Sequence, residues 1–173
     1  MKHDPQPFYL TEGQPIFKGD EPALDEAKEE LRREALRLGA LVFGVASPDE
    51  VAKRAPKGHT PEDFLPGVKS VVVVGGGKML AGAWRCRDPR WVGVLSSLKL
   101  RQVKEVSFKL AEFIEERFGY YAVPYASYSL SRGVWDPDLS IKLCAELAGL
   151  GTRSMAGGVV CLLYTSPSPR DRG

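Results

Sequence analysis

The sequence predicts an α/β domain in which helices pack on a small sheet of at least three strands. Three short runs of β-prone apolar residues, at 41–46, 69–74 and 120–126, have the length and composition of strands that other chain covers on both faces. The segments around these runs repeat apolar residues every three or four positions, which is the period of an amphipathic helix. This mixture of elements favours an α/β domain over a helical bundle or a β-sandwich.

The first predicted element is a helix that begins near Pro22 and ends at Gly39. Proline suits the first turn of a helix because its missing N–H has no partner there in any case. A strand over residues 41–46 follows. Residues 1–20 contain three prolines and no periodicity, so we expect an extended arm that lies on the domain. The apolar positions of the helix are Leu24, Ala27, Leu31, Ala35 and Leu38.

Two short helices are predicted next, because residues 47–50 (SPDE) and 60–63 (TPED) both combine a hydroxyl, a proline and acidic residues. In this arrangement the hydroxyl caps the helix, the proline fills the first turn, and a carboxylate reaches back to the backbone of the cap. A turn at Leu65-Pro66-Gly67 then leads into the second predicted strand, at residues 69–74.

The run GGGK at residues 75–78 closes this strand, but it does not match the phosphate-binding loop motif, so a nucleotide cradle is the less favoured interpretation. That motif requires a glycine where Val72 stands and a hydroxyl residue where Met79 stands. A dinucleotide-binding fingerprint fails as well, because Leu80 occupies its third glycine position. We expect a tight exit from the strand, where the backbone turns close to other atoms.

The second half of the chain predicts a long helix that ends at Gly119, a strand over 120–126, and a helix opened by Asp136-Pro137 that closes at Gly149. The long helix is outlined by Leu95, Leu98, Val103, Val106, Leu110, Phe113 and Ile114. The last helix is outlined by Leu139, Leu143 and Leu147.

Composition is that of an ordinary globular domain: 43% of the 173 residues are hydrophobic, 27% are charged, and the net charge is +2. No apolar run approaches the ~20 residues that cross a bilayer, and the N-terminus lacks a signal-peptide core, so we expect a cytoplasmic protein. A local basic cluster, Arg85, Arg87 and Arg90, lies between Trp84 and Trp91. A solvated loop anchored by the two tryptophans is the favoured interpretation, and contact with phosphates is the alternative.

The three cysteines are too widely spaced for a familiar metal or cluster site, so no metal ligands are assigned to this chain. Cys144 lies beside an apolar helical stripe and is expected to be a small buried hydrophobic residue. His3 and His59 are isolated in the sequence, and neither is expected to bind a metal.

The last residues look foreign to the domain. Residues 161–171, CLLYTSPSPRD, resemble the in-frame translation of a sequencing adapter. We therefore expect the native sequence to stop near Val160, which leaves residues 21–160 as a C-terminally truncated domain and 161–173 as a non-native tail with few contacts beyond Tyr164.

Three stretches, taken in order, carry a family resemblance: Leu38-Gly39 running into residues 42–46 (VFGVA), residues 64–74 (FLPGVKSVVVV), and residues 145–151 (AELAGLG). Together they resemble the N-terminal part of the epoxyqueuosine reductases and of related corrinoid iron–sulfur oxidoreductases, which include reductive dehalogenases. The resemblance implies that the whole enzyme holds cobalamin in this α/β region and receives electrons from two [4Fe-4S] clusters in a following ferredoxin-like region.

The resemblance also implies candidate site residues and partners. The family acts on a modified tRNA base or on small organic halides, so tRNA or a small molecule is the implied substrate. The aspartate proposed as its proton donor aligns with Trp135, which makes the next residue, Asp136, the candidate catalytic acid, unless it serves as a helix cap. Arg85 and Arg87 match an Arg-x-Arg-Asp stretch of the reductases and are candidate substrate-binding residues.

Other features limit what this chain is expected to do alone. Residues 151–155, GTRSM, replace the GWIGK of the tRNA-specific reductases, which favours a relative with another substrate. The chain by itself is expected to be inactive, because the cluster cysteines are not in it. A non-catalytic α/β binding module and an RNA-binding domain are the alternative functions.

Overall fold

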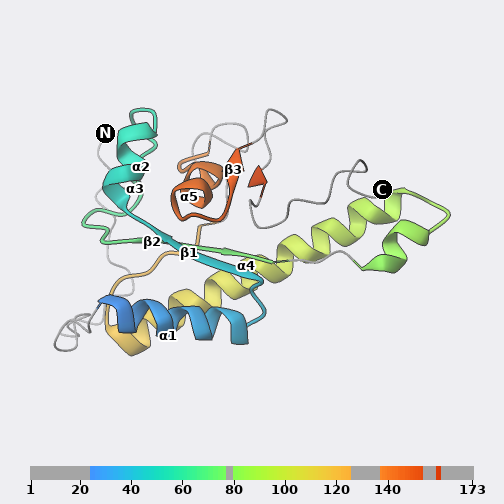
Figure 1. Cartoon of the computed structure of the whole chain (residues 1–173), viewed down its shortest axis with the longest axis horizontal. Coiled ribbons are helices and arrows are strands. Elements are labelled where there is room, and N and C mark those ends of the chain that lie inside the picture. Colours follow the sequence, from blue (N-terminus) through green and yellow to red (C-terminus); the bar gives the residue numbers. More distant parts are fainter. Residues whose placement is uncertain (1–23, 77–79, 126–136, 154–158, 161–173) are drawn as a thin grey trace, which may run out of the picture.

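The computed structural model describes residues 24–76, 80–125, 137–153 and 159–160. The predicted arm at 1–20 and the predicted tail at 161–173 lie outside the described residues. The chain has an α/β fold, in which helices lie above and below a central pair of strands (Figure 1). The elements are α1 (Leu24–Arg37), β1 (Val42–Ala46), α2 (Pro48–Arg54), α3 (Pro61–Phe64), β2 (Val71–Gly75), η1 (Ala81–Arg85), α4 (Arg90–Phe118), α5 (Ile141–Leu147), β3 (Thr152–Arg153) and β4 (Val159–Val160).

The described strands form two antiparallel pairs and not one larger sheet. Strands β1 and β2 pair along their full length, with Val42 opposite Gly75 and Ala46 opposite Val71. Strands β3 and β4 form a separate pair of two residues each. The first pair is the centre of the domain, because every larger helix packs on one of its faces or beside it.

The third strand predicted at 120–126 is wrong for its described part, since residues 120–125 form no strand. Two hydrogen bonds that involve side chains hold this segment in place of strand pairing. The backbone N–H of Ala122 donates to the Glu115 carboxylate at 3.0 Å. The hydroxyl of Tyr125 accepts from the backbone N–H of Leu139 at 3.0 Å, and its ring meets Phe64 edge-on. The segment is therefore fixed by side-chain contacts.

The two faces of the β1–β2 pair carry two separate hydrophobic clusters, because successive side chains of a strand point in opposite directions. Val71 and Val73 face the α5-side cluster, and Val72 and Val74 face the α4-side cluster. The buried residues of the α5-side cluster are Ala46, Val51, Leu139, Leu143 and Cys144. Those of the α4-side cluster are Ala35, Ala40, Val106 and Leu110. The expectation of strands covered on both faces is confirmed.

Several predicted helix ends are confirmed. Thr60 and Asp63 form a complete capping box, in which the Asp63 N–H donates to Thr60 Oγ1 and the Thr60 N–H donates to the Asp63 carboxylate. Gly119 ends α4 with a left-handed φ of 71°. Ser47 precedes α2 as predicted, but its hydroxyl makes no capping bond. The carboxylate expected to reach back there, that of Glu50, pairs with Lys53.

The start of the last helix differs from its prediction. Helix α5 begins at Ile141, and the hydroxyl of Ser140 accepts from the backbone N–H of Leu143 at 3.3 Å. A cap at Asp136 is therefore wrong, because the residues between it and the helix make tertiary contacts in place of helical ones. His59 Nδ1 lies 2.8 Å from the carbonyl oxygen of Pro137, and the Leu139 N–H is held by Tyr125.

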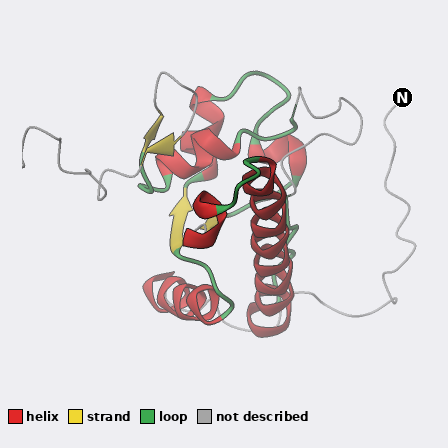
Figure 2. Ribbon diagram, turned by 90° about the vertical axis from the view of Figure 1, so that its right-hand side faces the viewer, coloured by secondary structure: helices red, strands yellow, loops and turns green. Residues whose placement is uncertain are grey.

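Helix α4 is much longer than the strands on which it packs. Its 29 residues span about 43 Å, whereas a five-residue strand spans about 17 Å. The second half of α4 covers the sheet, while the first half projects beyond it (Figures 1 and 2). In this first half Trp91, Val94 and Leu98 are exposed. Despite its length, neither α4 nor any other described helix combines the length and apolar character that a bilayer-crossing segment needs.

Candidate functional site

The three stretches that carry the family resemblance meet at one place in the fold. The first two are the paired strands β1 and β2, and the third forms the end of α5 and the turn after it. Gly44 of β1 is the point of contact. A Cβ atom at this position would lie 2.7 Å from the carbonyl oxygen of Ala148 and 3.1 Å from Leu150 Cδ2. Glycine at 44 therefore lets α5 approach the sheet directly.

The candidate substrate residues Arg85 and Arg87 lie in a basic arm, which we define as residues 84–91, running from the end of η1 into the first turn of α4. Both arginine side chains are exposed, and within the described residues neither forms an ion pair. Trp84 is 69% exposed and Trp91 is 53% exposed. The expectation that the tryptophans anchor a loop is therefore wrong, because their rings are largely uncovered by the described chain.

Arg90 differs from the other two arginines because it is already paired. Its guanidinium lies 2.6 Å from the Asp88 carboxylate, which also accepts from the Arg90 backbone N–H at 2.9 Å. The hydrogen bond from the guanidinium lowers the pKa of Asp88 below its ordinary value. Arg85 and Arg87 are thus the arginines of the arm whose charge is available to an outside anion.

The candidate acid Asp136 lies outside the described residues. Pro137 to Ser140, which lead from it into α5, lie at the α5-side cluster. Arg85 and Arg87 lie on or beside η1, which packs on the projecting half of α4. The candidate acid's neighbours and the candidate substrate residues are therefore parts of different elements, and the described residues do not gather them into one site.

The two described cysteines have different surroundings. Cys144 is only 2% exposed and belongs to the α5-side cluster, and burial raises the pKa of its thiol to about 11. Cys86 is exposed, and its Sγ lies 3.4 Å from the Gly82 carbonyl oxygen. Cys144 is confirmed as a buried hydrophobic residue. Because its thiol resists ionisation, it does not fit the thiolate role in an iron–sulfur cluster.

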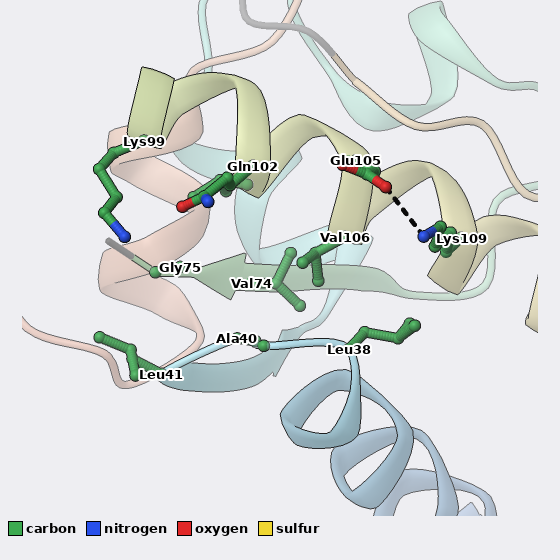
Figure 3. Close-up of a pocket in the computed structure, with 13 residues that line it drawn as sticks. Leu38, Ala40, Leu41, Val74, Gly75, Lys99, Gln102, Glu105, Val106 and Lys109 are labelled. Atoms are coloured by element: carbon green, nitrogen blue, oxygen red, sulfur yellow. Dashed lines mark ion pairs between the residues drawn. The ribbon is translucent and has the colours of Figure 1, made fainter. Parts of the chain in front are cut away.

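A groove of about 390 Å³ lies where β2 ends, and it was not predicted from the sequence. Three parts of the chain form it: the turn between α1 and β1, the end of β2 with Gly76, and the sheet-facing side of α4 (Figure 3). The one sequence feature that pointed to this groove was the glycine run at 75–77. It indicates that the backbone passes close to another part of the chain, but it does not identify that part. The other lining residues are far apart in the chain, so their meeting depends on the fold.

The groove has an apolar floor and a polar rim. Val74 and Val106 lie between the sheet and α4, and Val103 also lines the groove. Lys99, Gln102, Glu105 and Lys109 project from α4. Glu105 and Lys109 form an ion pair at 2.8 Å. A hydrogen bond from Lys109 lowers the pKa of Glu105 below its ordinary value. Lys99 reaches toward Gly75 at the end of β2, and within the described part of the chain it has no carboxylate partner (Figure 3).

The size of the groove suits a small molecule and not the corrin that the resemblance implies. Its volume lies near the lower end of the range for small-ligand sites. A corrin macrocycle with its side chains and nucleotide tail is far larger, so the groove does not fit cobalamin. Comparisons of the chain with protein-family models, curated proteins and solved structures gave no match.

Proposed function

We propose that this chain forms the N-terminal α/β part of a cytoplasmic reductase that depends on cobalamin and [4Fe-4S] clusters, similar to epoxyqueuosine reductases or to reductive-dehalogenase-like relatives. The observation that supports this proposal is the meeting of the three resembling stretches around Gly44. In this fold the three stretches form one packed unit, as they would in a domain shared with that family. In such a reductase the bound corrin and clusters supply the electrons for reduction.

The described residues of this chain do not themselves fit either cofactor. The groove is too small for a corrin, and Cys144 is buried while Cys86 lies beside η1. Under this proposal the cluster thiolates and much of the corrin site belong to other parts of the enzyme, and this chain alone is inactive. Its contribution is the folded support on which those parts assemble.

The proposal is tested by the natural coding sequence beyond the codon for Val160. We expect two sets of closely spaced cysteines there, as two [4Fe-4S] clusters require. The full-length protein, purified without oxygen, is expected to contain about eight irons and to bind cob(II)alamin, measured by iron analysis and by absorption spectroscopy. A coding sequence without cysteine clusters would end the proposal.

Within this proposal Asp136 donates the proton that completes reduction. Asparagine is close to aspartate in shape but cannot act as an acid, so Asp136→Asn in the full-length enzyme is expected to lower the turnover rate by roughly a hundredfold with folding unchanged. Asp138→Asn is the matched control, since Asp138 lies two residues later, and we expect its rate to stay within about threefold. A rate for Asp136→Asn within about threefold of the unaltered enzyme would assign the proton to another group.

RNA binding is a second candidate function, supported by the exposed basic arm. Single-stranded RNA is bound by cations that contact phosphates and by aromatic rings that stack on bases, and Arg85, Arg87, Trp84 and Trp91 provide both. Binding of a fluorescent single-stranded RNA is expected to weaken steeply with salt. The double variant Arg85→Gln/Arg87→Gln should reduce the slope of log affinity against log salt concentration by about 2, the change expected when two phosphate contacts are lost. Equal binding by this variant would exclude the arm as an RNA surface.

A further inference from the structure

We propose that the groove at the end of β2 binds a small organic anion with an apolar body, and that Lys99 contacts its anionic group. A carboxylate, sulfonate or phosphate monoester carried on an aromatic or aliphatic group of modest size has this chemistry. The inference does not rest on the proposed reductase function, because it uses only the shape and charge of this chain.

The apolar part of the inference comes from the floor of the groove. Val74 from β2 and Val103 and Val106 from α4 line it, together with Ala40 and Leu41 from the turn before β1. Leu41 is exposed to solvent, so a ligand that covers it removes apolar surface from water. A fully polar ligand would cover this floor but would bury no apolar surface of its own against it, so it would gain less binding free energy.

The anionic part comes from the charge balance along α4. Of the three charged side chains that the described residues place at the rim, Glu105 and Lys109 neutralise each other through their ion pair. Lys99 lies nearer the end of β2 and remains as a net positive charge. Gln102, between the two, adds a neutral donor and acceptor. The described residues of the rim therefore carry a net charge of +1, which is that of Lys99 at the end nearest Gly75 (Figure 3).

Gly76 keeps the groove open. A Cβ atom added there would meet the Gly39 carbonyl oxygen and Val103 Cγ2, both at 3.5 Å, and both residues line the groove. This is ordinary van der Waals contact, and Gly76 is not among the described glycines with a left-handed φ. A larger side chain at 76 would therefore enter the groove without straining the backbone, which provides a direct way to fill it.

The experiment compares two fluorescent probes that differ in one charged group. 8-Anilinonaphthalene-1-sulfonate has an aromatic body and a sulfonate, and N-phenyl-1-naphthylamine has the same body without it. We expect the sulfonate to bind more tightly to the unaltered chain. Lys99→Met should weaken the sulfonate by about tenfold, the size of a lost charge-assisted contact, and leave the neutral probe within about twofold. Arg101→Met, on the same helix outside the groove, is the matched control and should change neither.

The filling variant tests the location. Gly76→Val should weaken both probes by at least tenfold, while Gly82→Val, where an added Cβ meets nothing within 4 Å, should weaken neither. The proposal is overturned if a folded Gly76→Val protein keeps its affinity, or if Leu98→Ser on the projecting half of α4 removes binding instead. If Gly76→Val does not fold, the two-probe comparison at Lys99 decides, and equal loss of both probes there rejects the anion contact.

Discussion

Gly44 shows at the scale of one residue how closely α5 approaches the sheet. We expect Gly44→Ala to lower the free energy of unfolding by about 2 kcal/mol, because its Cβ would lie 2.7 Å from a backbone oxygen that cannot move without shifting α5. Urea denaturation measures the change. Gly82→Ala is the control, since its added methyl meets open space. An unchanged midpoint for Gly44→Ala would show that α5 is not held against β1.

Cys144 gives the fold a dependence on alkaline pH. Its folded pKa of about 11 lies above the ordinary value of 9.0, because burial disfavours the thiolate. Above pH 9 the unfolded chain gains stability by ionising this thiol while the folded chain does not. The contribution of Cys144 is therefore complete below about pH 9 and is lost between about pH 9 and 11.

Unfolding free energies measured at about pH 8 and about pH 10.5 test this expectation. The unaltered chain should lose more stability between these two conditions than Cys144→Ala does, although the variant is less stable at both because it packs less well. Cys86→Ala is the control, since Cys86 is exposed. Equal pH dependence in Cys144→Ala and the unaltered chain would show that the thiol ionises freely in the fold.

Gly93 in helix α4 is a glycine that neither its backbone angles nor a close neighbouring atom requires. Gly93 lies in the projecting half and is exposed, and a Cβ atom added there would meet nothing within 4 Å. Gly93→Ala is therefore expected to raise the free energy of unfolding by about 0.5–1 kcal/mol, through the lower backbone entropy of alanine in the unfolded chain. Thermal unfolding followed by circular dichroism measures it, and no gain would indicate that this half unfolds before the rest of the domain.

The elements that could be predicted from the sequence are those whose ends depend on residues close together in the chain. The capping box at Thr60 and the helix end at Gly119 depend on residues within a few positions of each other, and both were predicted correctly. The cap expected at Asp136 failed because His59 and Tyr125, distant in sequence, hold the segment before α5. The strand expected at 120–126 failed in its described part for the same kind of reason, since Tyr125 packs on Phe64, which is distant in sequence.

At the scale of the molecule, the two hydrophobic clusters share one pair of strands. We expect Leu110→Ala in the α4-side cluster and Leu143→Ala in the α5-side cluster each to lower the free energy of unfolding by about 2–4 kcal/mol. Because Val71 to Val74 contribute to both clusters, the transitions should remain single. Backbone hydrogen exchange at the amides of Leu110 and Leu143 should report the same loss of stability in each variant, and unequal losses would show that the clusters unfold independently.

The fold class was predictable because apolar strand runs and amphipathic helices are visible in the sequence. The pairing of those strands was not, since β1 and β2 meet through a register that no local pattern specifies. The same limit applies to the sites. Arg85 and Arg87 were found as a sequence cluster, whereas the groove joins Leu41, Gly76 and Lys99 from three separate segments, and only the folded chain brings them together.

Because α4 is much longer than the strands, the sheet supports only the second half of the helix. Its contact with the sheet ends near Val103, and Arg90 at its first turn lies roughly 20 Å beyond that point along the helix axis. Lys99 lies only about 6 Å from Val103 along the helix axis, whereas the basic arm lies at the far end, where Trp84 and Trp91 are exposed.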